Sequence, residues 1–373
     1  MQPTKENKLI NTEIDNRMSW IRNVDKLNEN DSESYYCEYE IASECNIPGV
    51  LNYQNGMILS SFLTVNRDRN NLYHYILKIK YAGLKEPFIN KKASQKGYYF
   101  KDGIVGELLA IFSLYFQCRF YLIASYFGEL SSHNVKTKAE INFIYQQCSP
   151  HIHPPIFSNR NKNFAKGLGD FLDSIKSLDT KYHQQFILAC YHYSRALKEI
   201  GIDSEMIFVR LVSSIEALSE FIKLNDKDDL FEGKKFEDII KNDVLSNEEN
   251  IELKKIFDVR KAGKKFIRFI EQYSMGFFKG GKYRAIHTKI KKSDLPKILK
   301  TIYDARSSYL HNGEPMYLSQ PNRNSYKWRW DTDPSLGMII DNRKMTTSKK
   351  LPYTYWFEEL VRHCLLSFLK KSS

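Results

Sequence analysis

The stretch "SEMIFVRLVSSIEALSEFIKL" (residues 204–224) decides the fold of the C-terminal half of the chain. Apolar side chains recur in it at helical spacing and share one face, at Ile207, Leu211, Ile215, Leu218 and Ile222. Asp203 or Ser204 stands where a helix N-cap is expected. The pattern therefore predicts an amphipathic helix that packs its apolar face against other elements.

Helical patterns continue on both sides of this stretch. One precedes it at 180–201 and stops on Gly201, and another follows at 250–274. A third begins after a Ser293/Asp294 cap, carries Pro296 in its first turn and ends at Asn312-Gly313. The chain closes on a fourth, "YWFEELVRHCLLSFLKK". We therefore predict an all-α bundle over residues 161–373.

The first 160 residues have a different character. The β-branched and aromatic runs at 34–44, 57–65 and 72–83 alternate in part and are separated by Asn-, Gly- and Arg-rich breaks, which predicts strands. The apolar run at 103–128 is interrupted by three polar residues, Glu107, Gln117 and Arg119, which favours a buried helix over a membrane span. Three prolines in 148–163 mark a boundary. We expect an N-terminal α+β domain over 1–160 and an α+β chain overall.

Cysteine usage and the start of the chain bear on its compartment. The six cysteines show no repeated spacing, and they lie at Cys37, Cys45, Cys118, Cys148, Cys190 and Cys364. This scatter indicates reduced thiols in a cytoplasmic protein. The first 16 residues are polar throughout, so no cleavable signal is expected there.

The net charge of +12 is concentrated in one segment. Residues 254–300 hold 15 Lys and Arg against 3 Asp and Glu, which leaves 41 basic and 41 acidic residues in the rest of the chain. Concentrated positive charge favours a polyanionic partner, because neutralising phosphates releases counterions. The alternative is a solvated basic surface. Within the segment, Lys264, Lys265 and Arg268 are candidate contacts to RNA phosphates.

"YDARSSYLHNGEP" (303–315), directly after the basic segment, carries an unusual arginine. On an ideal helix Arg306 falls on the apolar stripe that runs from Leu295 to Tyr309, where a charge is costly unless it is paired or opens onto a cleft. His311 lies about 140° further around the helix, so one regular helix does not bring the two side chains together. A distorted helix end or a second copy of the chain would be needed. A structural ion pair or an arginine reaching to the rim is the alternative reading.

The spacing R-x4-H is weak by itself. The chain holds a second copy, Arg69 and His74, in a polar break before a predicted strand. Only Arg306 and His311 end a capped amphipathic helix beside the basic segment, so we treat the other copy as coincidence.

With its neighbours "FVRLVSSIEALSEF" and "KAGKKFIRFIEQYS", "YDARSSYLHNG" resembles the HEPN superfamily, and most closely its ApeA-like branch, over residues 165–373. The resemblance implies a helical bundle with R-x4-6-H near a helix end. It also implies a dimeric, metal-independent endoribonuclease of prokaryotic abortive-infection systems, with Arg306 and His311 as the matching residues. Many members have Asn, Asp or His after the arginine, whereas this chain has Ser307. Inert RNA-binding members also exist, so the fold does not establish cleavage.

The chemistry of metal-free RNA cleavage suits these residue types. Histidine exchanges a proton near neutral pH, and the arginine fork stabilises the charge that builds on phosphorus. The hypothesis has His311 as general acid/base and Arg306 as phosphate ligand, with Ser307, Tyr309 and Asn312 as possible positioning groups. RNA (tRNA is one candidate) is the expected partner, with a second copy of the chain and a phage-derived trigger sensed by the N-terminal domain. No metal, cofactor or membrane is expected.

Other features favour plain structural roles. Cys148, His151 and His153 lack a fourth ligand for zinc, so an ordinary loop is expected there. Glu216 lies off the apolar face and is most simply a solvated residue, although the ApeA-like resemblance leaves it open as a structural contributor. Trp328 and Trp330 can stack on bases, but packing is the simpler role. The functional alternative is a non-catalytic RNA-binding or protein-interaction module of the same fold, for instance an antitoxin-like partner.

Overall fold

The computed structural model describes residues 17–29, 34–54, 57–61, 72–82, 103–127, 166–200, 202–224, 261–279, 290–316 and 351–373, with residues 246 and 318 and six two-residue strands. These strands are β6 (Leu230–Phe231), β7 (Lys234–Lys235), β8 (Gln320–Pro321), β9 (Asp331–Thr332), β10 (Ile339–Ile340) and β11 (Arg343–Lys344). The described part is a mixed α+β, helix-rich structure, as predicted.

An antiparallel sheet forms the N-terminal layer. Its strands are β1 (Ser34–Ser43), β2 (Val50–Tyr53), β3 (Met57–Ser61), β4 (Tyr73–Ala82) and β5 (Phe120–Phe127), in the order β2-β3-β4-β1-β5. Tyr75, Leu77 and Ile79 alternate along β4 and are buried, and β1 pairs with them in register, so one face of the sheet enters the core. The strand predictions at 34–44, 57–65 and 72–83 are confirmed for β1, β3 and β4, whereas β2 was not predicted.

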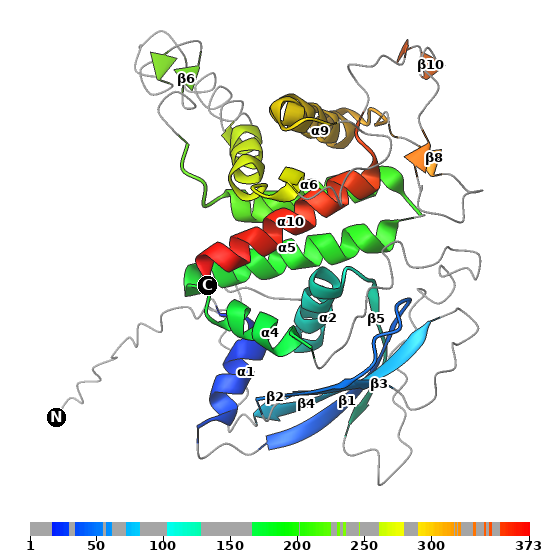
Figure 1. Ribbon diagram of the computed structural model, residues 1–373, viewed down its shortest axis with the longest axis vertical. Coiled ribbons are helices and arrows are strands. Elements are labelled where there is room, and N and C mark those ends of the chain that lie inside the picture. The colour runs from blue at the N-terminus through cyan, green and yellow to red at the C-terminus, as the bar shows by residue number, and fades with distance from the viewer. Residues whose placement is uncertain are drawn as a thin grey trace, which may run out of the picture.

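Two helices cover this face of the sheet (Figure 1). They are α1 (Ser19–Leu27), which the sequence did not reveal, and α2 (Gly103–Phe116). Glu107, fully buried on α2, accepts hydrogen bonds from the backbone N–H groups of Ser19 and Trp20, so a carboxylate satisfies the first turn of α1.

The prediction of one helix through 103–128 is wrong in its second half. α2 ends at Phe116, and the chain then enters β5. Gln117 adopts a left-handed φ of 54°, which stops the helix. The residues that follow, "FYLIASYF", are β-branched and aromatic and pair with β1.

The C-terminal half is built on a helical hairpin. α5 (Thr180–Glu199) and α6 (Ser204–Ser219) pack side by side, preceded by the short α4 (Leu168–Lys176). The Asp203 side chain accepts from the N–H groups of Glu205 and Met206, so the predicted cap of α6 is confirmed. Ser214 donates to the carbonyl of Ala189 across the hairpin at 2.7 Å.

Three further helices complete this half. α9 spans Leu295–Asn312 and α10 spans Thr354–Ser372, close to the predicted bounds. Residues 261–273 are helical, which confirms the end of the helix predicted over 250–274, while its predicted start lies outside the described residues. Pro296 lies in the first turn of α9, as predicted. Short 3-10 turns, η2 (Phe277–Lys279) and η3 (Lys292–Asp294), follow the 261–273 helix and precede α9.

The elements stack in layers along the long axis of the molecule (Figure 1). The sheet lies at one end, α1, α2 and α4 come next, α5 and α10 cross the middle, and α6 and α9 lie beyond them. One large hydrophobic core runs through all of these layers, and Ala42, Leu72 and Tyr121 form a small separate cluster. The predicted domain boundary near residue 160 lies outside the described residues, and the division into 1–160 and 161–373 stays a prediction.

The expectation that all six cysteines are reduced thiols is wrong for one pair. Cys45, just after β1, and Cys118, between α2 and β5, form a disulfide that the spacing of the cysteines did not predict. Cys37, Cys190 and Cys364 are free and buried, and Cys148 lies outside the described residues.

Within the described ranges, no helix has both the length and the apolar composition that crossing a membrane requires.

Candidate functional site around Arg306

Arg306 lies on α9 where that helix crosses α6. The helix buries Leu295, Leu299, Ile302 and Tyr303, and Arg306 continues the same face one turn later. Its side chain is 19% exposed, so the predicted charge on the apolar stripe is confirmed. Such a position requires a partner, because an unpaired charge at this depth is costly.

The partner is Glu216 of α6. Arg306 Nη2 lies 2.7 Å from Glu216 Oε2, and the glutamate side chain is 23% exposed. The Nε of Arg306 is buried and has no hydrogen-bond partner among the described residues. The guanidinium is thus held from one side, and part of its donor capacity is unused.

Tyr303, one turn earlier on α9, contacts both members of the ion pair. Its hydroxyl donates to Glu216 Oε1 at 3.0 Å, while the Arg306 guanidinium carbon lies 5.9 Å from the centre of its ring. Burial and the neighbouring Glu216 carboxylate raise the pKa of the Tyr303 phenol, which therefore remains a neutral donor. Glu216 is fixed by two donors from α9, and it fixes Arg306 in turn.

The helix over residues 261–273 supports Tyr303 from the other side. The ring of Phe266 lies 5.4 Å from that of Tyr303. Gly263 faces the same ring so closely that a Cβ atom there would lie 3.0 Å from Tyr303 Cε1. A larger residue at this crossing would therefore require the Tyr303 ring to shift by a few tenths of an ångström.

The predicted RNA contacts lie on this supporting helix. Lys265 donates to the backbone carbonyl of Glu220 at 3.4 Å, Arg268 pairs with Glu271 at 3.0 Å, and Lys264 follows Gly263 directly. All three side chains are at least partly exposed. The fold therefore brings part of the basic segment to the helix beside Arg306, whereas residues 254–260 and 280–289 of that segment lie outside the described residues.

His311 is exposed and does not meet Arg306. Among the described residues, it makes no hydrogen bond or ion pair with Arg306. α9 remains helical through Asn312 and ends on Gly313 in the left-handed region, with φ of 66°. The Gly313 and Glu314 N–H groups bond back to Tyr309 and Ser308. A distorted helix end that swings the histidine round, one of the two predicted arrangements, is therefore wrong.

The other residues predicted for the site are placed around this helix end. Ser307 is half-buried, and Asn312 is exposed as the last helical residue. Tyr309 is half-buried, and burial together with the carboxylates of Glu205 and Asp203 raises its pKa. Within the described part of the chain, none of the three forms a hydrogen bond with the Arg306 guanidinium.

Glu216 does not have the simpler of the two roles expected for it. That simpler role was a solvated residue, whereas Glu216 is the ion-pair partner of Arg306. A signal was available, since α6 has a second face with Glu205, Val209, Val212 and Glu216 at helical spacing. Glu205 also meets the α9 end, accepting from the Met316 N–H at 2.6 Å. An arginine on the apolar stripe of one helix favours a carboxylate on the helix that packs against it.

Several weaker candidates cannot be placed. Arg69, Cys148, His151, His153, Trp328 and Trp330 lie outside the described residues. His74, the partner of Arg69 in the second R-x4-H, lies on β4 and bonds Glu40 on β1 at 2.7 Å.

Comparison of the chain with protein-family models, with curated proteins and with solved structures finds no match in any of the three.

Proposed function

We propose that the chain is a metal-independent endoribonuclease of prokaryotic anti-phage abortive-infection defence, with Arg306 and His311 as its catalytic residues. The observation that carries the proposal is the Arg306 site: a guanidinium held at 2.7 Å by Glu216 in a half-buried position, with a buried Nε that lacks a partner. A fixed, partly desolvated cation with unused donors suits a phosphate in a crowded transition state.

The reaction would use the ribose 2′-OH as the internal nucleophile. The 2′-oxygen forms a bond to the adjacent phosphorus while the bond to the 5′-oxygen breaks, giving a 2′,3′-cyclic phosphate and a 5′-OH. His311 accepts the 2′-OH proton while water protonates the leaving 5′-oxygen, or it protonates that oxygen while water accepts the 2′-OH proton. Arg306 stabilises the phosphorane charge. DNA lacks the 2′-OH and would be spared.

A second copy of the chain is required by this proposal. His311 lies about 140° around α9 from Arg306, and the helix is regular between them. Two α9 ends facing each other would place the histidine of one chain beside the arginine of the other. We therefore propose a homodimer with a composite active site.

The proposed RNA contacts and the proposed sensing role of the sheet are supported by the positions of basic residues and by the arrangement of the elements. Lys264, Lys265 and Arg268 lie on the helix next to Arg306 and would contact the RNA backbone, with tRNA as one candidate substrate. The sheet domain would sense a phage-derived trigger in the cytoplasm. It shares a continuous core with the helices, so a change in the sheet has a physical route to α6.

A non-catalytic RNA-binding or protein-interaction module is the second candidate. It is favoured by His311, which is exposed and lies about 140° around α9 from Arg306. It is also favoured by the pairing of Arg306 with Glu216, as in a structural ion pair. An antitoxin-like partner would use the same helices without cleavage.

The test is incubation of the purified protein with total RNA in excess chelator, with Arg306→Ala and His311→Ala in parallel. Arg195→Ala, on α5 away from α9, is the matched control. We expect cleavage with 2′,3′-cyclic phosphate ends for the wild type and the control, and losses of at least about a hundredfold for the two site variants. Equal RNA binding by all four proteins without cleavage, in the presence of phage lysate as trigger, would support the module instead.

A further inference from the structure

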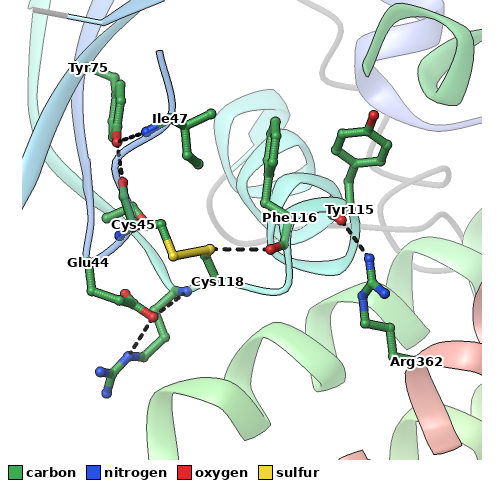
Figure 2. The surroundings of a disulfide bond; sticks show 10 residues. Glu44, Cys45, Ile47, Tyr75, Tyr115, Phe116, Cys118 and Arg362 are labelled. Carbon is green, nitrogen blue, oxygen red and sulfur yellow. Dashed lines mark hydrogen bonds and ion pairs between the residues drawn. A yellow bond between two sulfur atoms is a disulfide. The ribbon is translucent and has the colours of Figure 1, made fainter. Parts of the chain in front are cut away.

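The Cys45–Cys118 disulfide joins two turns that an ion pair also joins (Figure 2). Glu44 precedes Cys45, and Arg119 follows Cys118. The Glu44 carboxylate accepts from the backbone N–H of Arg119 at 3.0 Å and from its Nε at 3.2 Å. The side chains of this pair are 11% and 9% exposed, so water screens it little. The contact between the two turns therefore does not depend on the sulfur–sulfur bond alone.

The surroundings of Cys118 also accommodate a thiol. Its Sγ lies 3.3 Å from the carbonyl oxygen of Phe116, at the end of α2. Only a thiol has a proton to donate to that oxygen, since a disulfide sulfur has none. After reduction the two sulfurs must separate to van der Waals distance, and the Phe116 carbonyl is an acceptor within reach of the Cys118 thiol.

The turn that carries Cys118 is tied to α10. Gln117 Nε2 donates to both oxygens of Glu358, at 2.9 and 3.3 Å, and Glu358 is fully buried where it also accepts from the Tyr193 hydroxyl. One turn further along α10, Arg362 donates to the carbonyls of Leu114 and Tyr115 at 2.8 and 2.6 Å. The last turn of α2 and Gln117, the residue before Cys118, are therefore held against α10 by side chains of that helix.

We propose that Cys45 and Cys118 form a redox-modification site: the pair interconverts between disulfide and dithiol within the folded chain, coupled to the hydrogen bonds between Gln117 and α10. Both cysteines are 1% exposed, so an external thiol reaches a sulfur only when the 117–119 turn opens. That opening breaks the bonds from Gln117 to Glu358. The redox state of the sulfur pair therefore affects the stability of the contact between the turn and α10. Conversely, a stable contact slows thiol–disulfide exchange at the pair.

The reaction is thiol–disulfide exchange with a low-molecular-weight thiol such as glutathione. One thiolate attacks a sulfur of the pair, forms a mixed disulfide and releases the other cysteine as a thiol. A second thiolate resolves the mixed disulfide. The chain gains two electrons and two protons, and two molecules of the thiol leave joined as one disulfide. The reverse reaction consumes the oxidised form of the reagent.

The inference is independent of the ribonuclease proposal, because its readout is the sulfur pair itself. The full chain is equilibrated in mixtures of reduced and oxidised glutathione, quenched with acid, alkylated and mapped by mass spectrometry, while circular dichroism follows the fold. We expect Cys45 and Cys118 to interconvert as a pair with the spectrum unchanged, and Cys37, Cys190 and Cys364 to remain thiols throughout.

Gln117→Ala tests the coupling. We expect it to speed native-state reduction by about tenfold, as the loss of hydrogen bonds to a buried carboxylate implies. Gln185→Ala, a matched change on α5, should leave the rate at the wild-type value. A pair that is reduced only as fast as the whole chain unfolds, or a rate that Gln117→Ala leaves unchanged, would overturn the proposal.

Discussion

The Glu216–Arg306 ion pair is partly buried, so its contribution to stability matches neither that of an exposed pair nor that of a fully buried one. Exposed ion pairs contribute about 0.2–1 kcal/mol, whereas breaking a buried pair costs about 3–5 kcal/mol. With side chains 19% and 23% exposed, this pair lies between the two cases. Its geometry also includes the Tyr303 hydroxyl, so removing Glu216 leaves both a cation and a phenol without their partner.

A double-mutant cycle measures the pair directly. We expect Glu216→Ala and Arg306→Ala to show a coupling free energy of about 1–2 kcal/mol in urea unfolding, because each single change strands the other side chain. The exposed Arg268–Glu271 pair is the control and should give less than about 0.5 kcal/mol. A coupling no larger than that of the control would mean that Glu216 does not hold Arg306 in place.

His192 gives a prediction about pH. Burial, with the nearby Arg210, lowers the pKa of this α5 imidazole to about 4. The unfolded chain has a histidine pKa of about 6.5, so between pH 6.5 and 4 it binds the proton before the folded chain does. Stability is therefore lost as pH falls through that window, by about 2–3 kcal/mol for this group. In unfolding titrations His192→Gln should remove that part of the slope, and an unchanged slope would contradict the prediction.

At the scale of elements, the crossing of α9 with its supporting helix depends on one glycine. Gly→Ala within a helix ordinarily stabilises by up to about 1 kcal/mol. At Gly263, however, the added methyl would lie 3.0 Å from the Tyr303 ring. We expect Gly263→Ala to destabilise the chain by about 1–3 kcal/mol, because the ring and its bond to Glu216 must shift. Gly169→Ala, whose nearest neighbour would lie at 3.9 Å, is the control and should be neutral or stabilising.

α10 acts as a clamp on the end of α2. Arg362 satisfies two carbonyls that the helix end leaves without intrahelical partners. Arg362→Ala should cost about 2–3 kcal/mol of unfolding free energy, since the arginine makes two charged hydrogen bonds. Lys371→Ala, at the exposed end of α10, should change stability by less than about 0.5 kcal/mol. Similar effects for the two variants would contradict the clamp.

These elements also show what sequence reasoning can reach. Helical periodicity placed α5, α6, α9 and α10 because each has an apolar face of three turns or more. Periodicity did not separate α2 from β5, since both are apolar on nearly every side and the break between them is a single left-handed residue, Gln117. β2, at four residues, is too short to give a pattern.

The same holds for the functional site: features of a single helix could be predicted from the sequence, whereas contacts between distant segments could not. Arg306 was found because its position on a stripe is a property of one helix. Glu216, the Cys45–Cys118 bond and the Gln117–Glu358 contact join segments 73 to 241 residues apart, and no local pattern encodes them. They depend on how the helices cross, which follows from the packing of the whole core.

The whole molecule has a core that passes without interruption from the sheet to α9. α2 packs on β5 and on α5 at once, so removing either half exposes apolar surface of the other. We expect one cooperative unfolding transition, with far-ultraviolet dichroism and tryptophan fluorescence from Trp20 and Trp356 changing together. A fragment of residues 161–373 should be markedly less stable than the intact chain. Two separated transitions would mean that the halves fold independently.

The proposed active site is shared between two chains, and this arrangement can be tested by mixing subunits. Arg306→Ala and His311→Ala are each expected to abolish RNA cleavage. If each site takes its arginine from one chain and its histidine from the other, a 1:1 mixture re-equilibrated as random dimers contains intact sites again. Half of the dimers are then mixed, and one of the two sites in each is complete, so we expect about a quarter of wild-type cleavage. No recovery in the mixture, with mixed dimers present by native mass spectrometry, would contradict it.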